Sequence, residues 1–319
     1  MSSKNILFFS TVGNKIGIGH YKRLQNLSQY PYFKKNNKSF YVLNVDKSNI
    51  LNKKFKIRSK KSFNSFNFKN NYNYSFLDLS NEYSYKNKNE ILNIFYKIKK
   101  VSKKIILIDC IGKYKLAQFI SKYIYIDFIL SPYLNEIKSS NYRFINGYKY
   151  TILSSKLINY SKKIQFNNIA KRITLTFGGS DIYECNLSII NILNKIDEEI
   201  NLSIIIGPFF TKNYIKKIKI ACDKGSHKYK LIKNSLNLYP IFYKSDLIIV
   251  GSGLTKYEIS STGIPQIIIS SSNEDEKYNL PFKKNGLSTI NLHKNTEVYN
   301  LKIIKNIIFN KLLRKKISE

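Results

Sequence analysis

The fold is decided by the stretch from Ile6 to Arg23, which reads ILFFSTVGNKIGIGHYKR. The apolar run at its start, Ile6 to Phe9, is typical of the first buried strand of a parallel sheet. Ligands of open α/β sheets bind outside the carboxyl ends of the strands, so the loop after this strand is a predicted site of chemistry. Gly17 and Gly19 in that loop permit close backbone approach, and the free N–H groups of the following helix point above the sheet.

His20 stands at the start of the predicted helix. A neutral imidazole can accept a proton from water at neutral pH, so His20 is a candidate general base. A histidine at a helix start can also serve only as a cap or a packing residue, and the residues alone leave both interpretations open. A dinucleotide-binding loop is disfavoured, because Lys22 stands where that fingerprint needs its third glycine.

The length of 319 residues exceeds the size at which one core usually stops growing and predicts two domains, 1–160 and 161–319. No uninterrupted apolar run approaches the ~18 to 20 residues of a membrane helix, and the first run is too short for a signal peptide. We therefore expect a cytoplasmic protein without a transmembrane segment. The cysteines lie far apart without a Cys-x-x-Cys pair and indicate neither disulfides nor structural zinc; they are Cys110, Cys185 and Cys222.

The formal net charge of +34 is the first sign by which nucleic-acid binding is usually suspected. Here lysine is spread over the whole chain, arginine is scarce, and no helix-turn-helix, RNA-recognition or zinc-finger pattern occurs. We therefore expect no nucleic-acid partner, although a non-catalytic basic protein that binds nucleic acid or an acidic surface stays an alternative. The positive field favours anionic small molecules such as nucleoside diphosphates.

The first half of the chain alternates apolar runs with helical patterns, as doubly wound α/β domains do. We expect strands at 40–45, 105–108 and 125–130, and helices at 87–99 and 113–123. Between 49 and 74 a low-complexity mixture of Asn, Lys, Ser and Phe predicts an irregular excursion with one short strand. Asp109 closes the strand at 105–108 and so places a carboxylate at the same sheet edge as His20.

The second half repeats the pattern of strand, glycine loop and helix. We expect strands at 173–177, 202–206, 247–250 and 266–269, and helices from about 186, at 212–222 and at 256–261. The chain ends in a basic helical segment, and a terminal helix of this kind could pack back across the first domain.

A second candidate site is the turn Gly251-Ser252-Gly253-Leu254, which directly follows the apolar run Leu247 to Val250. Successive N–H groups in such a turn form an anion-binding concavity suited to a diphosphate. Glu258 sits one turn inside the following helix, where its carboxylate can accept two hydrogen bonds from a ribose diol. A glutamate in a first turn can also serve only to favour the helix dipole.

The acidic triplet Glu274-Asp275-Glu276 follows the predicted strand at 266–269. Three adjacent acids could hold a metal in an enzyme of nucleotide sugars. They are more often the solvated first turn of a helix, and we favour that interpretation.

Several of these motifs together resemble one family, the nucleotide-sugar hydrolase of pseudaminic acid synthesis. Related proteins are the predicted glycosyltransferases of spore-coat polysaccharide synthesis and, more distantly, the MurG-type transferases. The resemblance covers nearly the whole chain. It is carried by Gly17-x-Gly19-His20-x-x-Arg23, Gly147-x-x-Tyr150-x-x-Leu153, Phe177-Gly178-Gly179-Ser180-Asp181, Gly251-Ser252-Gly253 with Glu258, Gly263-x-Pro265, and Asn273.

The resemblance implies an α/β protein of the GT-B class, with two Rossmann-like doubly wound domains that face each other across a cleft and need no metal or cofactor. It places UDP mainly against the second domain and the sugar beside the first. His20 would be catalytic, with Asp109 orienting its ring or binding a sugar hydroxyl. The substrate-binding and nucleotide-binding residues would be Gly17, Gly19, Arg23, Gly178, Gly179, Ser180, Ser252, Gly253, Leu254, Glu258 and Asn273.

The activity that the resemblance implies is release of UDP from a UDP-linked 2,4-diacetamido-2,4,6-trideoxyhexose, with water attacking the anomeric carbon. The alternative is a glycosyltransferase of surface polysaccharide synthesis, since the same cleft can admit a sugar or lipid hydroxyl. Two departures from the family bear on the substrate. This chain has Asn273-Glu274 where the family has Asn-Gln, and Asp109-Cys110-Ile111-Gly112 where the family has an aromatic or histidine-containing segment.

Overall fold

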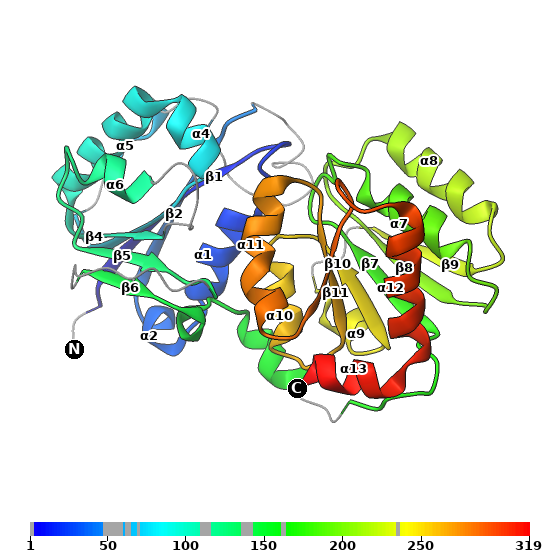
Figure 1. Cartoon of the computed structure of the whole chain (residues 1–319). Coiled ribbons are helices and arrows are strands. Elements are labelled where there is room, and N and C mark those ends of the chain that lie inside the picture. The colour runs from blue at the N-terminus through cyan, green and yellow to red at the C-terminus, as the bar shows by residue number, and fades with distance from the viewer. Residues whose placement is uncertain are drawn as a thin grey trace. The chain divides into compact units, whose positions relative to one another are not determined.

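The computed structural model describes residues 3–46, 60, 65–68, 71–108, 116–134, 143–160, 164–233 and 237–319. The chain divides into two compact units, Met1–Ser155 and Lys156–Glu319. Each unit is an open parallel sheet with helices on both faces (Figure 1). The predicted α/β class and its two doubly wound sheets are thus confirmed. Among the helices of the described ranges, none is both long and apolar enough to cross a membrane.

The sheet of unit 1 has six described strands in the order β2-β1-β3-β4-β5-β6. Their bounds are β1 Asn5–Val12, β2 Asn37–Asn44, β3 Tyr72–Asp78, β4 Ser102–Ile108, β5 Phe128–Ser131 and β6 Phe144–Asn146. β1 and β4 are central and their middle residues are buried on both faces, as strands between two helix layers must be.

The helices of unit 1 cover the two faces of its sheet. They are α1 Gly19–Leu27, α2 Pro31–Lys34, α4 Asn81–Lys86, α5 Lys88–Val101 and α6 Leu116–Ile120. Leu7 and Phe9 of β1 pack with α5 and α6, whereas Ile6 and Phe8 point the other way and pack with α1. The alternation of successive side chains along β1 therefore divides the core of unit 1 into two layers.

The sheet of unit 2 has the order β12-β11-β10-β7-β8-β9. Its strands are β7 Arg172–Thr176, β8 Asn201–Ile206, β9 Lys228–Lys233, β10 Leu247–Val250, β11 Gln266–Ser270 and β12 Ser288–Asn291. Its helices are α7 Cys185–Leu193, α8 Lys212–Asp223, α9 Tyr239–Phe242, α10 Thr255–Ser260, α11 Asn273–Lys284, α12 Glu297–Phe309 and α13 Lys311–Ser318.

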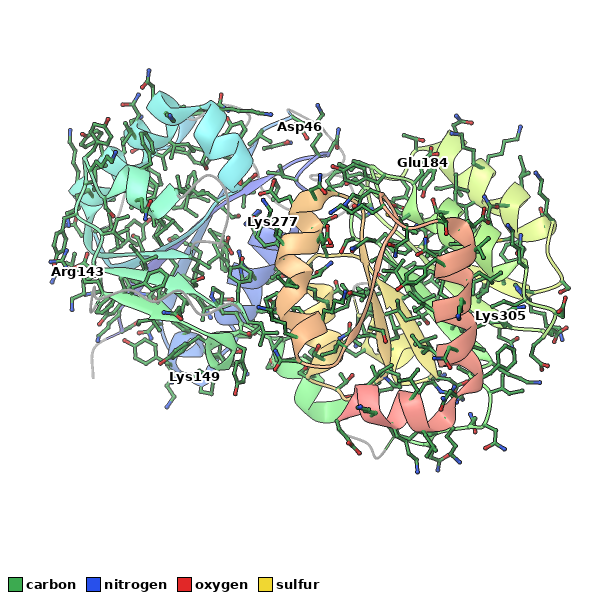
Figure 2. All side chains as sticks on the ribbon, viewed as in Figure 1. Asp46, Arg143, Lys149, Glu184, Lys277 and Lys305 are labelled. Atoms are coloured by element: carbon green, nitrogen blue, oxygen red, sulfur yellow. The ribbon has the colours of Figure 1, made fainter. Side chains whose placement is uncertain are left out.

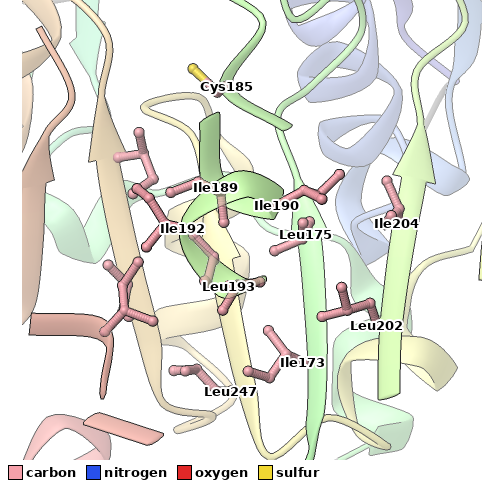
Figure 3. Packing of buried hydrophobic residues seen from close by; sticks show 14 of the residues in the cluster. Ile173, Leu175, Cys185, Ile189, Ile190, Ile192, Leu193, Leu202, Ile204 and Leu247 are labelled. Atoms are coloured by element: carbon pink, nitrogen blue, oxygen red, sulfur yellow. The ribbon is translucent and has the colours of Figure 1, made fainter. Parts of the chain in front are cut away.

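One large apolar cluster holds unit 2 together. Ile189, Ile190 and Leu193 of α7 lie against Leu175 of β7 and Ile204 of β8 (Figure 3). The same cluster takes in buried isoleucines of α8, α12 and α13. Complete burial of a side chain of this kind stabilises the fold by about 1.5–3 kcal/mol, so this layer fixes the helices on one face of the sheet.

The terminal helix α13 is fastened within unit 2 by a buried arginine. Arg314 is 1% exposed, and it donates hydrogen bonds to the main-chain oxygens of Ile307 and Ile308 at the end of α12 and to those of Asn167 and Asn168. Ser318 donates a hydrogen bond to the main-chain oxygen of Gly263.

Both sheets reverse their order of winding beside their first strand. In unit 1 the chain goes from β1 to β2 on one side and then to β3 on the other, and in unit 2 it goes from β7 to β8 and β9 and then to β10 on the other side. Such a reversal opens a crevice at the carboxyl ends of the two central strands, where open α/β sheets bind their ligands. The expected positions are therefore between β1 and β3 and between β7 and β10.

Strands with long apolar runs agree with the sequence prediction, and β10 does so to the residue. Of the predicted helix at 113–123, the structure shows α6 at Leu116–Ile120 and a turn at 121–123, and 113–115 lie outside the described residues. Most of the predicted excursion at 49–74 lies outside the described residues, and its last residues, 72–74, belong to β3, which continues to Asp78. β6, β9 and β12 were not predicted from the sequence.

Candidate functional site

The candidate site of unit 1 joins the carboxyl end of β3 to the start of α1. β1, which precedes α1 in the chain, is the neighbour of β3 in the sheet. Ser10 of β1 pairs with Asp78, the last residue of β3. The loop after β1 turns back into α1, whose second residue is His20. Nδ1 of His20 lies 2.7 Å from Oδ1 of Asp78, so the winding reversal of this sheet brings an imidazole and a carboxylate together.

Asp78 is fully buried and also holds Arg23, which is 3% exposed. Nε of Arg23 donates to Oδ2 at 2.5 Å and Nη2 donates to Oδ1 at 2.7 Å. Burial alone would favour the neutral acid, but the charges of Arg23 and His20 and their hydrogen bonds outweigh it and lower the pKa of Asp78. The carboxylate is therefore ionised at neutral pH.

Arg23 completes this network by donating from Nη1 to the hydroxyl of Tyr133 at 2.5 Å. Burial opposes the guanidinium charge, but Asp78 and Tyr133 raise the pKa of Arg23 well above its usual value. The sequence predicted Arg23 as a substrate-binding residue. In the structure its donors point at Asp78 and Tyr133, so it positions the carboxylate that touches His20.

The hydrogen bond to Asp78 fixes the chemistry available to His20. When the ring is uncharged and donates its Nδ1 proton to the carboxylate, Nε2 carries the lone pair. The His20 side chain is 21% exposed, so solvent and small ligands can reach the ring. This arrangement can accept a proton from water or from an alcohol.

The glycine loop before His20 is tightly closed. Gly13 and Gly17 exchange two backbone hydrogen bonds, of 3.1 and 2.7 Å, and Gly17 has a φ of 70°, which favours glycine. A Cβ on Gly13 would lie 2.5 Å from Oδ2 of Asp46. Gly17 thus shapes the loop, and Gly19 is the first residue of α1.

Asp109, the second catalytic residue predicted from the sequence, lies outside the described residues. Sequence reasoning missed Asp78 and Tyr133. The signal for Asp78 was the pattern from Tyr72 to Asp78, in which aromatic and aliphatic residues alternate with polar ones and an aspartate ends the run. Its polar surroundings concealed the strand.

The candidate site of unit 2 is formed by the loops that follow β7 and β10. The two strands are neighbours, and the N–H of Gly251 donates to the main-chain oxygen of Thr176 at 3.1 Å. A Cβ on Gly251 would meet Phe177 at 3.5 Å. The glycine loop at 178–180 and the turn at 251–254 therefore lie side by side.

The loop at 178–184 is held by a buried carboxylate. Asp181 accepts hydrogen bonds from the N–H groups of Cys185 and Asn186, from the Asn186 side chain, and from the hydroxyl of Tyr214. Gly178 and Asp181 have φ values of 75° and 44°, which is ordinary for glycine and uncommon for aspartate. Asp181 thus caps α7 and fixes the loop that contains Gly179 and Ser180.

Gly207, which directly follows β8, lies against the main chain of this loop. A Cβ there would lie 2.4 Å from the oxygen of Gly178 and 2.3 Å from that of Gly179. The loop at 178–180 can therefore adopt its position only because residue 207 has no side chain. Gly207 was not predicted as a site residue from the sequence.

The turn at 251–254 is anchored by its serine. Ser252 Oγ donates to the main-chain oxygen of Ile269 at 2.9 Å and accepts from Nδ2 of Asn279 at 2.9 Å. Gly253 is exposed, and a Cβ added to it would have no neighbouring atom within 4 Å. The turn is thus held by hydrogen bonds at Ser252 and accessible at Gly253.

Glu258 is half-buried on α10, and its Oε1 accepts a hydrogen bond from the Tyr239 hydroxyl at 2.8 Å. This contact fixes the direction of the carboxylate. Asn273, the first residue of α11, is exposed and its Oδ1 lies 3.2 Å from Nε2 of His293. All residues that the sequence predicted for nucleotide binding after position 170 thus follow strands at one edge of this sheet.

The acidic triplet forms the first turn of α11, and each acid has its own partner. Glu274 accepts from Tyr278. Asp275 accepts from Ser271, and Glu276 pairs with Lys294. Within the described ranges, no group of three His, Cys, Asp or Glu residues is placed to hold a metal ion.

No protein-family model matches the chain. The uncharacterized protein MJ1062 of Methanocaldococcus jannaschii is 29% identical over 126 residues, a match that covers 39% of this chain and 26% of that protein. The chain therefore spans about a quarter of the length of this relative.

Solved structures resemble the chain over almost its whole length. Acinetobacter baumannii MurG matches with a TM-score of 0.62 and 11% identity, over 99% of this chain and 94% of MurG. Anabaena Alr3699/HepE in complex with UDP-glucose matches with a TM-score of 0.58 and 11% identity, over 99% and 92%. UDP-GlcNAc 2-epimerase from Neisseria meningitidis bound to UDP-GlcNAc matches with a TM-score of 0.53 and 12% identity, over 99% and 94%. Together with the two sheets, these likenesses show the GT-B fold.

Proposed function

We propose that this chain is an enzyme that hydrolyses a UDP-sugar. The observation that carries the proposal is the pair of His20 and Asp78 at the winding reversal of unit 1, because it presents an oriented imidazole where a ligand of this fold is expected. Structures of the same fold that bind UDP-sugars, such as the HepE complex with UDP-glucose, support the choice of substrate class.

The proposed step breaks the bond between the anomeric carbon and the UDP oxygen. A water molecule attacks the anomeric carbon and its proton passes to Nε2 of His20, while UDP departs with the bonding electrons. Asp78 stabilises the imidazolium that forms, since its ionised carboxylate already touches Nδ1. UDP is a good leaving group, so the reaction needs this base and a site for the diphosphate more than it needs a strong acid.

Unit 2 is the proposed nucleotide side. Gly178, Gly179 and Ser180 would line the nucleotide, and the turn at 251–254 would hold the diphosphate with its N–H groups. Glu258 would accept hydrogen bonds from the ribose diol. We propose that the sugar is a 2,4-diacetamido-2,4,6-trideoxyhexose, as the sequence resemblance implies.

A glycosyltransferase is the second candidate, because a base such as His20 can deprotonate an acceptor hydroxyl as well as water. The likeness to MurG favours this possibility. Purified protein incubated with the UDP-linked diacetamido sugar and no acceptor distinguishes the two. Release of UDP and free sugar in equal amounts, lost in His20→Ala, supports hydrolysis. UDP release only after an alcohol acceptor is added supports transfer. If no UDP-sugar releases UDP, with or without an acceptor, both candidate functions are wrong.

A further inference from the structure

Lys256 is a buried lysine beside the turn at 251–254. It is 2% exposed, and its Nζ donates a hydrogen bond to Oδ1 of Asn279 at 2.6 Å. The rings of Phe282 and Tyr257 have their centroids 4.8 and 5.6 Å from Nζ. Among the residues that the structure describes, none forms an ion pair with this group. An ammonium group in such surroundings is costly to hold.

Burial lowers the pKa of Lys256 to about 7, and the nearby carboxylate of Asp275 opposes this only in part. Asp275, on α11, already accepts from the N–H and the hydroxyl of Ser271 at 3.0 and 2.5 Å. On α10 itself the other titratable groups are Tyr257 and Glu258, and Glu258 accepts from Tyr239. Near neutral pH the amine and the ammonium forms of Lys256 are therefore comparable in population.

Asn279 connects this lysine to the turn. Its Nδ2 donates to Oγ of Ser252 at 2.9 Å and to Oγ of Ser270 at 2.8 Å, while its Oδ1 accepts from Lys256. One amide group and two hydrogen bonds thus separate Nζ from the serine that anchors the turn. A charge on Lys256 acts on that turn through protein rather than through water, so it is weakly screened.

We propose that Lys256 makes unit 2 selective for a nucleoside diphosphate over an uncharged nucleoside, by taking up a proton when the anion binds beside the turn at 251–254. The inference rests on the proposed function, which places the diphosphate at Ser252, Gly253 and Leu254. The negative charge of the ligand favours the ammonium form. One proton therefore passes from solvent to Nζ as the diphosphate enters, and it returns to solvent when the diphosphate leaves.

The test is calorimetric titration of the full chain with UDP and with uridine at pH 8, in two buffers that differ in ionisation enthalpy. UDP is fully ionised at this pH, because the second pKa of a terminal phosphate is about 6. We expect wild-type protein to take up roughly half a proton or more per UDP bound, and none with uridine. In Lys256→Met the uptake disappears and UDP binds about tenfold more weakly, whereas the affinity for uridine is unchanged.

Lys277→Met is the matched control, because Lys277 is an exposed lysine of α11 (Figure 2). It removes the same formal charge and should leave proton uptake as in wild type. UDP binding to wild type without proton uptake would overturn the inference and leave the proposed function intact, and this measurement needs no variant. Equal losses of UDP and uridine affinity in Lys256→Met would also overturn it, since they indicate a packing role. Absence of any UDP binding to wild type would overturn both proposals.

Discussion

His20 and Asp78 are 58 residues apart in the chain, and their side chains meet at 2.7 Å between Nδ1 and Oδ1. The contact exists because β1 and β3 are neighbours in the sheet although β2 lies between them in sequence. Arg23, three residues after His20 and one turn further along α1, donates a hydrogen bond to the same carboxylate. The imidazole, the carboxylate that it contacts and the guanidinium that stabilises this carboxylate thus come from two elements.

Replacement of His20 should remove the proposed base without disturbing the fold. We expect His20→Ala to lower the rate of UDP release by about 100-fold or more, the usual contribution of a general base. Gln29→Ala, at an exposed position just after α1, is the control and should keep the wild-type rate. Rates are measured by coupled detection of UDP, with circular dichroism to compare the folds. Near-normal turnover by folded His20→Ala protein would contradict the assignment.

Removal of Arg23 should leave the buried carboxylate of Asp78 without its ion-pair partner. In Arg23→Met the carboxylate of Asp78 loses two hydrogen bonds, and breaking a buried ion pair of this kind costs about 3–5 kcal/mol. The free energy of unfolding from urea titration gives this loss directly. In the wild type, the pKa of Asp78 is lower in the folded protein than in the unfolded chain. The ionised carboxylate therefore stabilises the fold at pH values above its unfolded pKa of about 3.9. This stabilisation is lost as the pH falls through the folded pKa.

The double variant Arg23→Met with Asp78→Asn removes both charges. We expect it to recover part of the lost stability at pH 7, since no uncompensated charge is left in the interior. A double variant as unstable as the sum of the two single variants would show that the pair makes no mutual contribution.

Glu258 should distinguish riboses by their hydroxyl groups. We expect Glu258→Ala to bind UDP about tenfold more weakly, the loss of one or two charged hydrogen bonds. The affinity for 2′,3′-dideoxy-UDP, which has no diol, should be the same in wild type and variant. Isothermal titration with both ligands gives the comparison, and an equal loss for both would indicate that Glu258 acts only by holding Tyr239.

Two glycines of unit 2 should respond differently to the same added methyl group. A Cβ at Gly207 would collide with the main-chain oxygens of Gly178 and Gly179, so we expect Gly207→Ala to lower the free energy of unfolding by about 1–3 kcal/mol. At Gly253 no atom lies within 4 Å of the added carbon. Gly253→Ala should therefore change stability by less than ~0.5 kcal/mol. Thermal unfolding of the two variants side by side measures the difference, and equal stabilities would refute the steric argument.

Lys256 should make the stability of the protein depend on pH. Its pKa is about 7 in the fold and 10.5 in its ordinary state, so the unfolded chain holds more protons between these values. Stability therefore rises with pH in this window, by ~2 kcal/mol from pH 7 to pH 9 for this one group. We expect the rise to be missing in Lys256→Met and present in Lys277→Met. Urea titrations at several pH values measure it, and parallel curves for wild type and Lys256→Met would contradict the shift.

The central strands of both sheets could be predicted because a parallel strand between two helix layers must be apolar on both faces. The run Leu247 to Val250 is such a strand and was predicted to the residue. β9 could not be predicted in this way. Its sequence Lys-Tyr-Lys-Leu-Ile-Lys is polar because it lies at the edge of the sheet, and it becomes a strand by pairing with β8.

The glycine loops and His20 were visible in the sequence because their chemistry depends on residues that are neighbours in the chain. Asp78, the partner of His20, could not be predicted from the sequence. A hydrogen bond between residues 58 positions apart depends on which strands are adjacent. The same holds for Gly207, whose need for glycine arises from the oxygens of a loop almost thirty residues earlier. The sequence by itself determined the α/β class and the local glycine turns, because these follow from hydrophobic periodicity and backbone freedom. Only the tertiary structure decided which carboxylate orients the imidazole and which lysine is buried beside the turn, because strand order and burial are set by packing between distant segments.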